Sequence, residues 1–334
     1  MSNSDGQHYP ATRMRRLRVG AWSRDLVAEN ILTPADFIWA IILKDGTKVR
    51  EPIEAMPGVF RLSPDMAVDA AKQARDMGIP ALALFPYTSE TDRSEDAALA
   101  FRSDNLMCRT AEAIKQVVPD IGLMADVALD PYTDHGHDGF VKNGVIQNDE
   151  TVDALVKQAL ISAQAGFDIV APSDMMDGRV DAIRQALEAN GYQDTQIMAY
   201  AAKYASAFYG PYREAIGSSG VLKGDKRTYQ MDPANSDEAL REVALDIAEG
   251  ADSVMVKPAG AYLDIIHRVK EAFALPTFAF QVSGEYAMIK AAGQNGWIDE
   301  EKAILESLLA IKRAGANGII SYFALEASKL LEKK

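Results

Sequence analysis

The sequence predicts an α/β fold, specifically a closed (β/α)8 barrel preceded by an N-terminal arm. Three observations support this: eight short apolar runs follow one another along the chain, helical patterns separate them, and no G-x-G-x-x-G motif follows the first run. Apolar residues on both faces are typical of buried parallel strands, and eight βα units are enough to close a barrel. A doubly wound open sheet is the alternative, and the missing glycine motif disfavours it.

The expected strands are the apolar runs at residues 37–43, 81–86, 121–127, 167–173, 196–203, 253–258, 276–283 and 318–324. The helical patterns lie at residues 64–78, 105–118, 151–166, 177–191, 236–252, 261–275, 300–317 and 326–334. In the third of these, the apolar residues recur at 3.6-residue spacing and Gly166 supplies the C-terminal stop. We therefore predict a catalytic barrel over residues 36–334.

Residues 1–35 precede the first strand and form the predicted arm. The segment RMRRLR (13–18) is strongly basic, and Trp22 adds a large aromatic side chain. We expect this arm to lie on another subunit.

Composition limits the possible partners. The 334 residues carry a formal net charge of −13, which repels nucleic acid phosphates and anionic lipid, so neither is an expected partner. No apolar run approaches membrane-spanning length and the first residues contain no apolar leader segment, so a cytoplasmic location is expected. The single cysteine, Cys108, lies in a helical pattern and is expected to be a buried, unreactive thiol.

Reactive groups of a (β/α)8 barrel lie at the C-terminal ends of its strands. Two adjacent strands end in Lys203 and Lys257. Because neighbouring strands are about 4.8 Å apart, both amines should point into one mouth. Mutual repulsion and apolar surroundings should lower a lysine pKa and leave an amine able to form a Schiff base with a ketone. The alternative is that one lysine binds a carboxylate or pairs with Asp126.

The other strand-end residues and the segment after Lys203 suggest a site for an anionic substrate. Aromatic and basic side chains follow Lys203, and further polar groups come from the segment GDKRTYQ and from two later strand ends. These residues are Phe208, Tyr209, Tyr212, Arg213, Lys226, Arg227, Gln230, Ser283 and Tyr322. Together they could clamp a carboxylate. A solvated surface loop is the alternative for the segment GDKR.

The third strand leads into ADVALDPYTDHGHDG (125–139), with aspartates at 126, 130, 134 and 138. Pro131, Gly136 and Gly139 interrupt any helix there, so the stretch is predicted to be a loop. Its carboxylates and two histidines raise the question of a metal site.

Four motifs are specific: AKYASAFYGPYREA around Lys203, MVKPAGAYLDI around Lys257, YQMDPANSDEA and QVSGEYAMI. With them the chain resembles the porphobilinogen synthase (5-aminolevulinate dehydratase) family over nearly its whole length. The resemblance implies a hydro-lyase of tetrapyrrole biosynthesis, which condenses two 5-aminolevulinate molecules to porphobilinogen with loss of two waters. It also implies a (β/α)8 barrel whose arm wraps a neighbouring subunit, with a homo-octamer or hexamer as the assembly.

The resemblance also implies residue roles. Lys257 would form the principal Schiff base and Lys203 a second one, while Asp126 and Asp138 would act in acid–base chemistry. Ser283 and Tyr322 would hold one carboxylate, and Arg213, Lys226 and Gln230 the other, with the choice between Lys226 and Arg227 left open. The further substrate-binding residues would be Ser173, Tyr209, Tyr212 and Asp130.

The resemblance bears on metals as well. Zinc-dependent members carry three cysteines in the loop, where this chain has Ala128, Asp130 and Asp138, so no zinc and no obligatory active-site metal are expected. An allosteric Mg²⁺ at Glu242, with Arg13 of a neighbour's arm and Asp177 as outer partners, is implied by magnesium-responsive members. The alternative for Glu242 is a solvated helix residue. His135 and His137 are expected to be structural parts of a loop that orders over substrate.

Two other classes compete. A class I aldolase is also a barrel with a Schiff-base lysine, but it needs only one such lysine and often has phosphate-binding glycine loops after strands 7 and 8. No such loop follows QVSGEY or ISYFAL. A non-catalytic scaffold would tolerate Lys257→Ala without loss of its function.

Overall fold

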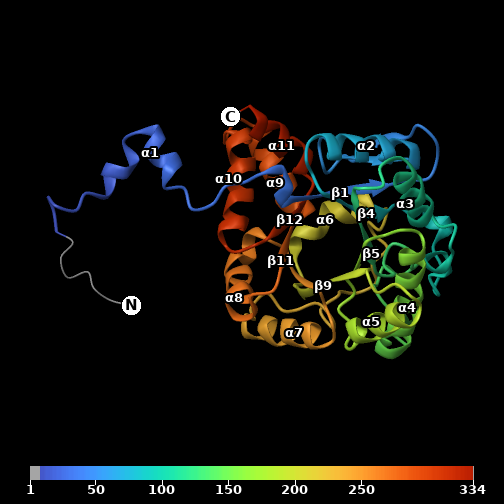
Figure 1. Ribbon diagram of the computed structural model, residues 1–334. Helices are drawn as coiled ribbons and strands as arrows, with labels where there is room; N and C mark the ends of the chain where they lie inside the picture. Colours follow the sequence, from blue (N-terminus) through green and yellow to red (C-terminus); the bar gives the residue numbers. More distant parts are fainter. Residues whose placement is uncertain (1–7, 334) are drawn as a thin grey trace.

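The computed structural model describes residues 8–333 and shows a closed barrel of eight parallel strands (Figure 1). The strands are β1 (Phe37–Leu43), β4 (Ala81–Pro86), β5 (Gly122–Val127), β8 (Ile169–Pro172), β9 (Gln196–Lys203), β10 (Ser253–Lys257), β11 (Thr277–Gln281) and β12 (Gly318–Ser321). Each pairs in parallel with the next, and β12 closes the ring on β1, where Phe37 lies opposite Ile319. The predicted (β/α)8 barrel is confirmed.

Helices surround the ring. They are α2 (Pro64–Asp76), α3 (Leu106–Val117), α4 (Asn148–Gln164), α5 (Arg179–Ala189), α7 (Asp237–Ala248), α8 (Leu263–Phe273), α10 (Glu300–Arg313) and α11 (Ala324–Glu332). The sequence missed α9 (Ser283–Gln294), and it wrongly extended the seventh strand to Ser283, which begins this helix. The short α6 (Gly210–Ala215) follows β9 near the C-terminal end of the barrel.

Two small antiparallel strand pairs lie outside the ring of eight parallel strands. β2 (Arg50–Pro52) runs antiparallel to β3 (Phe60–Leu62), and β3 joins the edge of β1. β6 (Val141–Lys142) and β7 (Val145–Ile146) form a hairpin after the aspartate-rich loop. The barrel strands themselves are buried on both faces, with β4, β8 and β10 buried at every position. This burial is the physical reason why their sequences read as continuous apolar runs.

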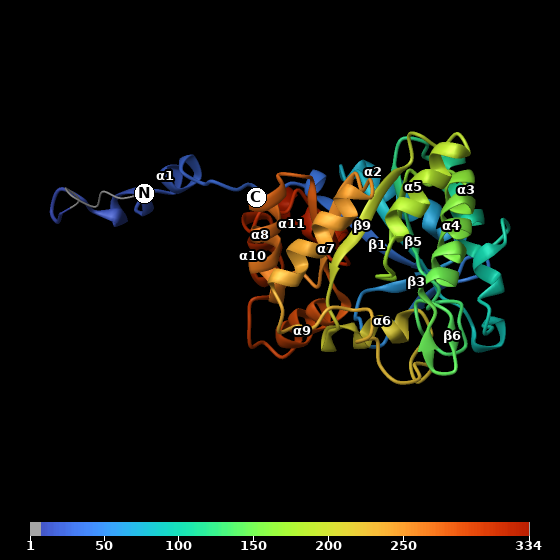
Figure 2. The same ribbon diagram turned by 90° about the horizontal axis from the view of Figure 1, so that it is seen from below.

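The described part of the arm, residues 8–35, extends away from the barrel in both views (Figures 1 and 2). It contains a 3-10 turn (Met14–Arg18) and α1 (Ala21–Leu26). Trp22 and Leu26 are 74% and 77% exposed. Both large apolar side chains are therefore accessible to solvent in this arrangement. Among the described residues no helix is long and apolar enough to span a membrane.

Candidate active site

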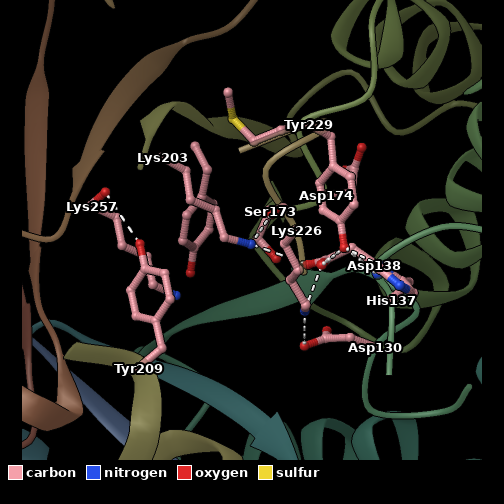
Figure 3. Close-up of polar contacts among 12 residues, drawn as sticks. Asp130, His137, Asp138, Ser173, Asp174, Lys203, Tyr209, Lys226, Tyr229 and Lys257 are labelled. Carbon is pink, nitrogen blue, oxygen red and sulfur yellow. Dashed lines mark hydrogen bonds and ion pairs between the residues drawn. The ribbon is translucent and has the colours of Figure 1, made fainter. Parts of the chain in front are cut away.

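Two lysines meet at the C-terminal end of the barrel. Lys203 ends β9 and Lys257 ends β10, and their Cα atoms are direct partners across the two strands. Only 5% and 7% of the two residues is exposed. The predicted juxtaposition is therefore present, and the two lysines have different surroundings (Figure 3).

Lys257 lies in an aromatic enclosure. Its Nζ is 4.6 Å from the ring centre of Phe280, 5.0 Å from that of Tyr200, and 5.4 Å from those of Tyr209 and Tyr212. Within residues 8–333 its Nζ forms no ion pair with a carboxylate. Burial, with the charge of Lys203 as the second cause, lowers the pKa of Lys257 to about 7. At neutral pH about half of the molecules then carry Lys257 as the free amine, which is the form that attacks a carbonyl.

Lys203, by contrast, is ion-paired. Its Nζ is 3.1 Å from Oδ1 of Asp138 and also donates a hydrogen bond to the backbone carbonyl of Ser173. The carboxylate partner of Lys203 is therefore Asp138, and the alternative pairing of one lysine with Asp126 is absent among residues 8–333. The loop after β5 carries Asp138 back over the barrel mouth, which places it closer to Lys203.

Asp138 is shared between two cations. Its Oδ2 is 2.6 Å from Nζ of Lys226, which is also 3.1 Å from Oδ2 of Asp130. Burial alone would raise the pKa of Asp138, but Lys203 and Lys226 outweigh it and hold this pKa well below its usual range. The pKa of Lys226 is raised, because Asp130 and Asp138 outweigh its own burial. These four residues form a charge-balanced cluster of two cations and two anions.

Asp126, the last acidic residue of β5, is in a different state. It is 7% exposed, and its Oδ1 has no hydrogen-bond partner in the described part of the chain. Burial raises its pKa to about 6, with Lys257 opposing and Asp130 reinforcing the shift. A carboxyl group that titrates close to neutral pH can both donate and accept a proton.

A small cavity lies between the lysines and the covering loops, with a volume of about 30 Å³. Its lining contains eight of the residues predicted for the site: Asp130, Lys203, Tyr209, Tyr212, Arg213, Lys226, Gln230 and Lys257. Pockets for small molecules usually span about 300–1,000 Å³. The cavity is therefore too small for a substrate in this arrangement, and substrates need the loops to open.

The remaining predicted residues lie around this cavity without lining it. The Ser283 hydroxyl accepts a hydrogen bond from the backbone N–H of Tyr212 at 2.9 Å. Tyr322 is buried, its ring centre is 6.0 Å from that of Phe280, and its hydroxyl has no partner among residues 8–333. Ser173 is buried beside Lys203.

Lys226 and Arg227 have different surroundings, although the sequence left open which of them binds the substrate carboxylate. Lys226 lines the cavity, whereas the Arg227 side chain is 64% exposed and pairs with Asp232 at 3.1 Å. Lys226 is therefore the better placed of the two to contact a bound molecule.

Two loops cover the cavity: the aspartate-rich loop (128–140) and the segment 216–236. His137 joins these covering loops. Its Nδ1 is 3.0 Å from the Tyr229 hydroxyl, and its Nε2 is 2.7 Å from the Lys223 carbonyl oxygen. Gly136 has a φ of +73°, and a Cβ there would lie 3.0 Å from the backbone of Leu222. A glycine is thus required where the aspartate-rich loop meets the segment around Lys223.

Three residues near the lysines escaped the sequence reasoning: Tyr200, Phe280 and Tyr229. Tyr200 and Phe280 lie inside β9 and β11, where an aromatic residue is indistinguishable from ordinary core. Tyr229 belongs to the motif YQMDPANSDEA, which identifies the family but gives no role for this side chain.

Glu242 lies on α7, half-buried, in a groove of about 690 Å³ that also contains Asp177 and Glu238. Its pKa is raised, first by burial and then by Asp246. Oxygen donors of this kind fit Mg²⁺. Within residues 8–333, however, no three His, Cys, Asp or Glu side chains are grouped as metal ligands. Arg13 donates a hydrogen bond to Tyr9 at 3.2 Å within its own arm.

Taken together, these observations define a (β/α)8-barrel enzyme whose candidate active site holds two buried lysines at adjacent strand ends. The family model described as delta-aminolevulinic acid dehydratase matches residues 11–330, and the chain belongs to this family. The predicted family, hydro-lyase class and place in tetrapyrrole biosynthesis are thereby confirmed.

Individual relatives agree. A delta-aminolevulinic acid dehydratase from Bradyrhizobium diazoefficiens is 61% identical over 96% of this chain and 91% of the relative. One from Rhodobacter capsulatus is 54% identical over 97% of each chain. The crystal structure of the Toxoplasma gondii enzyme in complex with porphobilinogen superimposes with a TM-score of 0.94, at 47% identity, covering 97% of this chain and 92% of that one.

Proposed function

We propose that this chain condenses two molecules of 5-aminolevulinate to porphobilinogen through Schiff bases on Lys257 and Lys203. The single observation that carries the proposal is the Lys257 amine, which is enclosed by aromatic rings and has a pKa lowered to about 7. Such an amine attacks the ketone of the first substrate at neutral pH. Lys203, its direct strand partner, lies in position to hold the second substrate.

Acid–base groups suit the two water losses. Forming an imine from a carbinolamine requires a proton on the departing hydroxyl group. Asp126, buried and with a pKa raised to about 6, is the donor on the Lys257 side. Asp138 accepts hydrogen bonds from Lys203 and Lys226 and serves the other side.

Cationic and neutral donors bind the substrate carboxylates. Arg213, Lys226 and Gln230 line the cavity near Lys203 and take one carboxylate. Ser283 and Tyr322 take the other, and the Tyr322 hydroxyl, which has no partner in the part of the chain that the structure describes, is a donor for it. Tyr209, Tyr212 and Asp130 complete the walls, and Ser173 contacts Lys203 beside them. Because the cavity is only about 30 Å³, the covering loops open for entry and close over the pair.

Borohydride trapping tests the proposal. The protein is mixed with 5-aminolevulinate, reduced and digested, and the added mass is mapped by peptide. We expect adducts on the Lys257 and Lys203 peptides, loss of the first in Lys257→Met, and no change in Lys72→Met, an exposed control on α2. A folded protein without either adduct would refute imine chemistry. An adduct that forms only with a sugar or a keto acid would favour an aldolase.

Assembly, metal and location complete the proposal. The exposed arm packs on a second copy, giving a homo-octamer or hexamer, and deletion of residues 1–35 is expected to lower the mass measured by light scattering. Glu242 binds an activating Mg²⁺ at a subunit contact, and no active-site metal takes part. The protein works in the cytoplasm, and the position of a fluorescent fusion protein in cells tests this location.

A further inference from the structure

A chain of hydrogen bonds runs from Lys203 to the outer groove. Lys203 Nζ contacts Oδ1 of Asp138 at 3.1 Å, and the Tyr229 hydroxyl donates to Oδ2 of the same carboxylate at 3.0 Å. That hydroxyl is 3.0 Å from Nδ1 of His137. His137 in turn lies on the wall of the groove of about 690 Å³. Figure 3 shows Lys203, Asp138, Tyr229 and His137 side by side.

The tautomer of His137 follows from its partners. Its Nε2 is 2.7 Å from the Lys223 carbonyl oxygen, which can only accept, so Nε2 carries a hydrogen. In the neutral ring Nδ1 is then an acceptor. Tyr229 has one hydroxyl hydrogen, for which Nδ1 and the Asp138 carboxylate compete.

The protonated ring removes this competition. An imidazolium donates from Nε2 to the Lys223 carbonyl oxygen and from Nδ1 to the Tyr229 oxygen, and Tyr229 donates to Asp138. Every donor and acceptor in the chain is then satisfied with the same heavy-atom positions. The geometry therefore accommodates a proton on His137 without any rearrangement.

Lys203 has a proton to lose. Its ion pair with Asp138 is the arrangement of the ammonium form, and an amine must be neutral before it attacks a ketone. Asp138 is a poor place to leave this proton, because Lys203 and Lys226 hold its pKa well below the usual range. Within residues 8–333, Asp126 forms no hydrogen bond to Lys203 that could take the proton instead.

We propose that His137 accepts the proton of Lys203 through Asp138 and Tyr229 when the second Schiff base forms. The N–H bond of Lys203 breaks and an O–H bond forms on Asp138. That proton passes to the Tyr229 oxygen as the Tyr229 hydrogen moves to Nδ1 of His137. One ammonium becomes an amine and one imidazole becomes an imidazolium, so charge and atoms balance. The return of the proton when Lys203 is released completes the cycle.

The inference rests on the proposed function, because it concerns the imine at Lys203. It makes Tyr229 and His137 positioning residues, since both act on Lys203 through Asp138. The charged and titratable groups around His137 are His135, Asp138, Lys223, Asp225, Lys226, Arg227 and Tyr229 on the covering loops, and Asp177, Glu238 and Glu242 across the groove.

The test measures the formation of each adduct separately. Rapid mixing with 5-aminolevulinate and borohydride quenching give the rates of labelling of the Lys203 and Lys257 peptides between pH 6 and 9.5. In Tyr229→Phe and His137→Ala we expect labelling of Lys203 at pH 7 to slow by about 10²-fold, the usual effect of a lost proton-transfer group. Labelling of Lys257 should stay unchanged, which reports an intact fold.

Two further readouts separate proton transfer from support of the loops. Imidazole added to His137→Ala should restore labelling of Lys203, because His137 borders an open groove, and raised pH should restore it in both variants. Tyr192→Phe and His267→Gln, on partly buried and exposed sites away from the lysines, serve as matched controls.

The outcomes are distinct. If wild-type protein shows no adduct on Lys203, the proposed function fails at that lysine. If wild type is labelled there and both variants match its rate at every pH, the proton path alone is refuted. Equal loss of labelling at Lys203 and Lys257, without rescue by imidazole, would show a structural role and also overturn the path.

Discussion

Replacing Lys257 with methionine should abolish labelling of this position by substrate and at the same time stabilise the protein. The side chain is almost fully buried, and its enclosure by four aromatic rings suits a thioether. The pKa of Lys257 is lowered from 10.5 to about 7. At 1.36 kcal/mol per pH unit, this difference corresponds to about 5 kcal/mol of destabilisation of the folded protein by the buried ammonium.

The sign sets the pH dependence. Because the folded-state pKa is depressed, the unfolded chain binds the extra proton between pH 10.5 and about 7, and stability rises with pH in that window. The advantage of Lys257→Met over wild type should be about 4 kcal/mol at pH 7, about 2 kcal/mol at pH 9, and close to zero above pH 10.5.

Urea unfolding of both proteins at pH 6, 7 and 9 measures this difference, at equal protein concentration because assembly also stabilises the folded state. Lys72→Met, on the surface, should show no pH-dependent gain. A Lys257→Met protein that is less stable than wild type at pH 7, or whose gain does not shrink between pH 7 and 9, would contradict the enclosed-amine argument.

Three further outcomes are expected. Asp138→Asn leaves Lys203 and Lys226 without their shared carboxylate and should lower the free energy of unfolding by about 3–5 kcal/mol, measured by urea titration against the exposed control Asp232→Asn. Arg213→Ala should raise KM by about 10–100-fold with little change in melting temperature, because a charged hydrogen bond to a carboxylate is lost, and an unchanged KM would remove Arg213 from the site. Cys108, buried and with a pKa raised to about 11 by burial, should resist alkylation in the native protein at pH 8 and react fully after denaturation.

The barrel could be predicted because its strands are buried on both faces. All eight predicted runs coincide with barrel strands to within three residues at each end. The error lies at QVSGEYAMI, where apolar residues continue across the junction between β11 and α9. Nothing in the local pattern marks Gln281 as the last strand residue, because α9 begins at Ser283, directly after the end of the strand.

The site could be predicted only in part. Strand-end position was enough to bring Lys203 and Lys257 together, since register across parallel neighbours is fixed by the barrel. The ion pair between Lys203 and Asp138 could not be predicted, because the path of the loop between Asp126 and Asp138 depends on contacts far along the chain. His137 illustrates this: its two ring nitrogens bond to Tyr229 and to the Lys223 carbonyl oxygen, more than 80 residues away.

The charge-balanced cluster at the barrel mouth has a consequence for engineering. Lys203, Lys226, Asp130 and Asp138 neutralise one another inside the protein, where added salt screens poorly. The exposed charges that make up the net −13 are screened within about 8 Å at physiological ionic strength. Exposed charged residues could therefore be substituted to change the solubility of the protein while the reactivity of the two lysines stays the same.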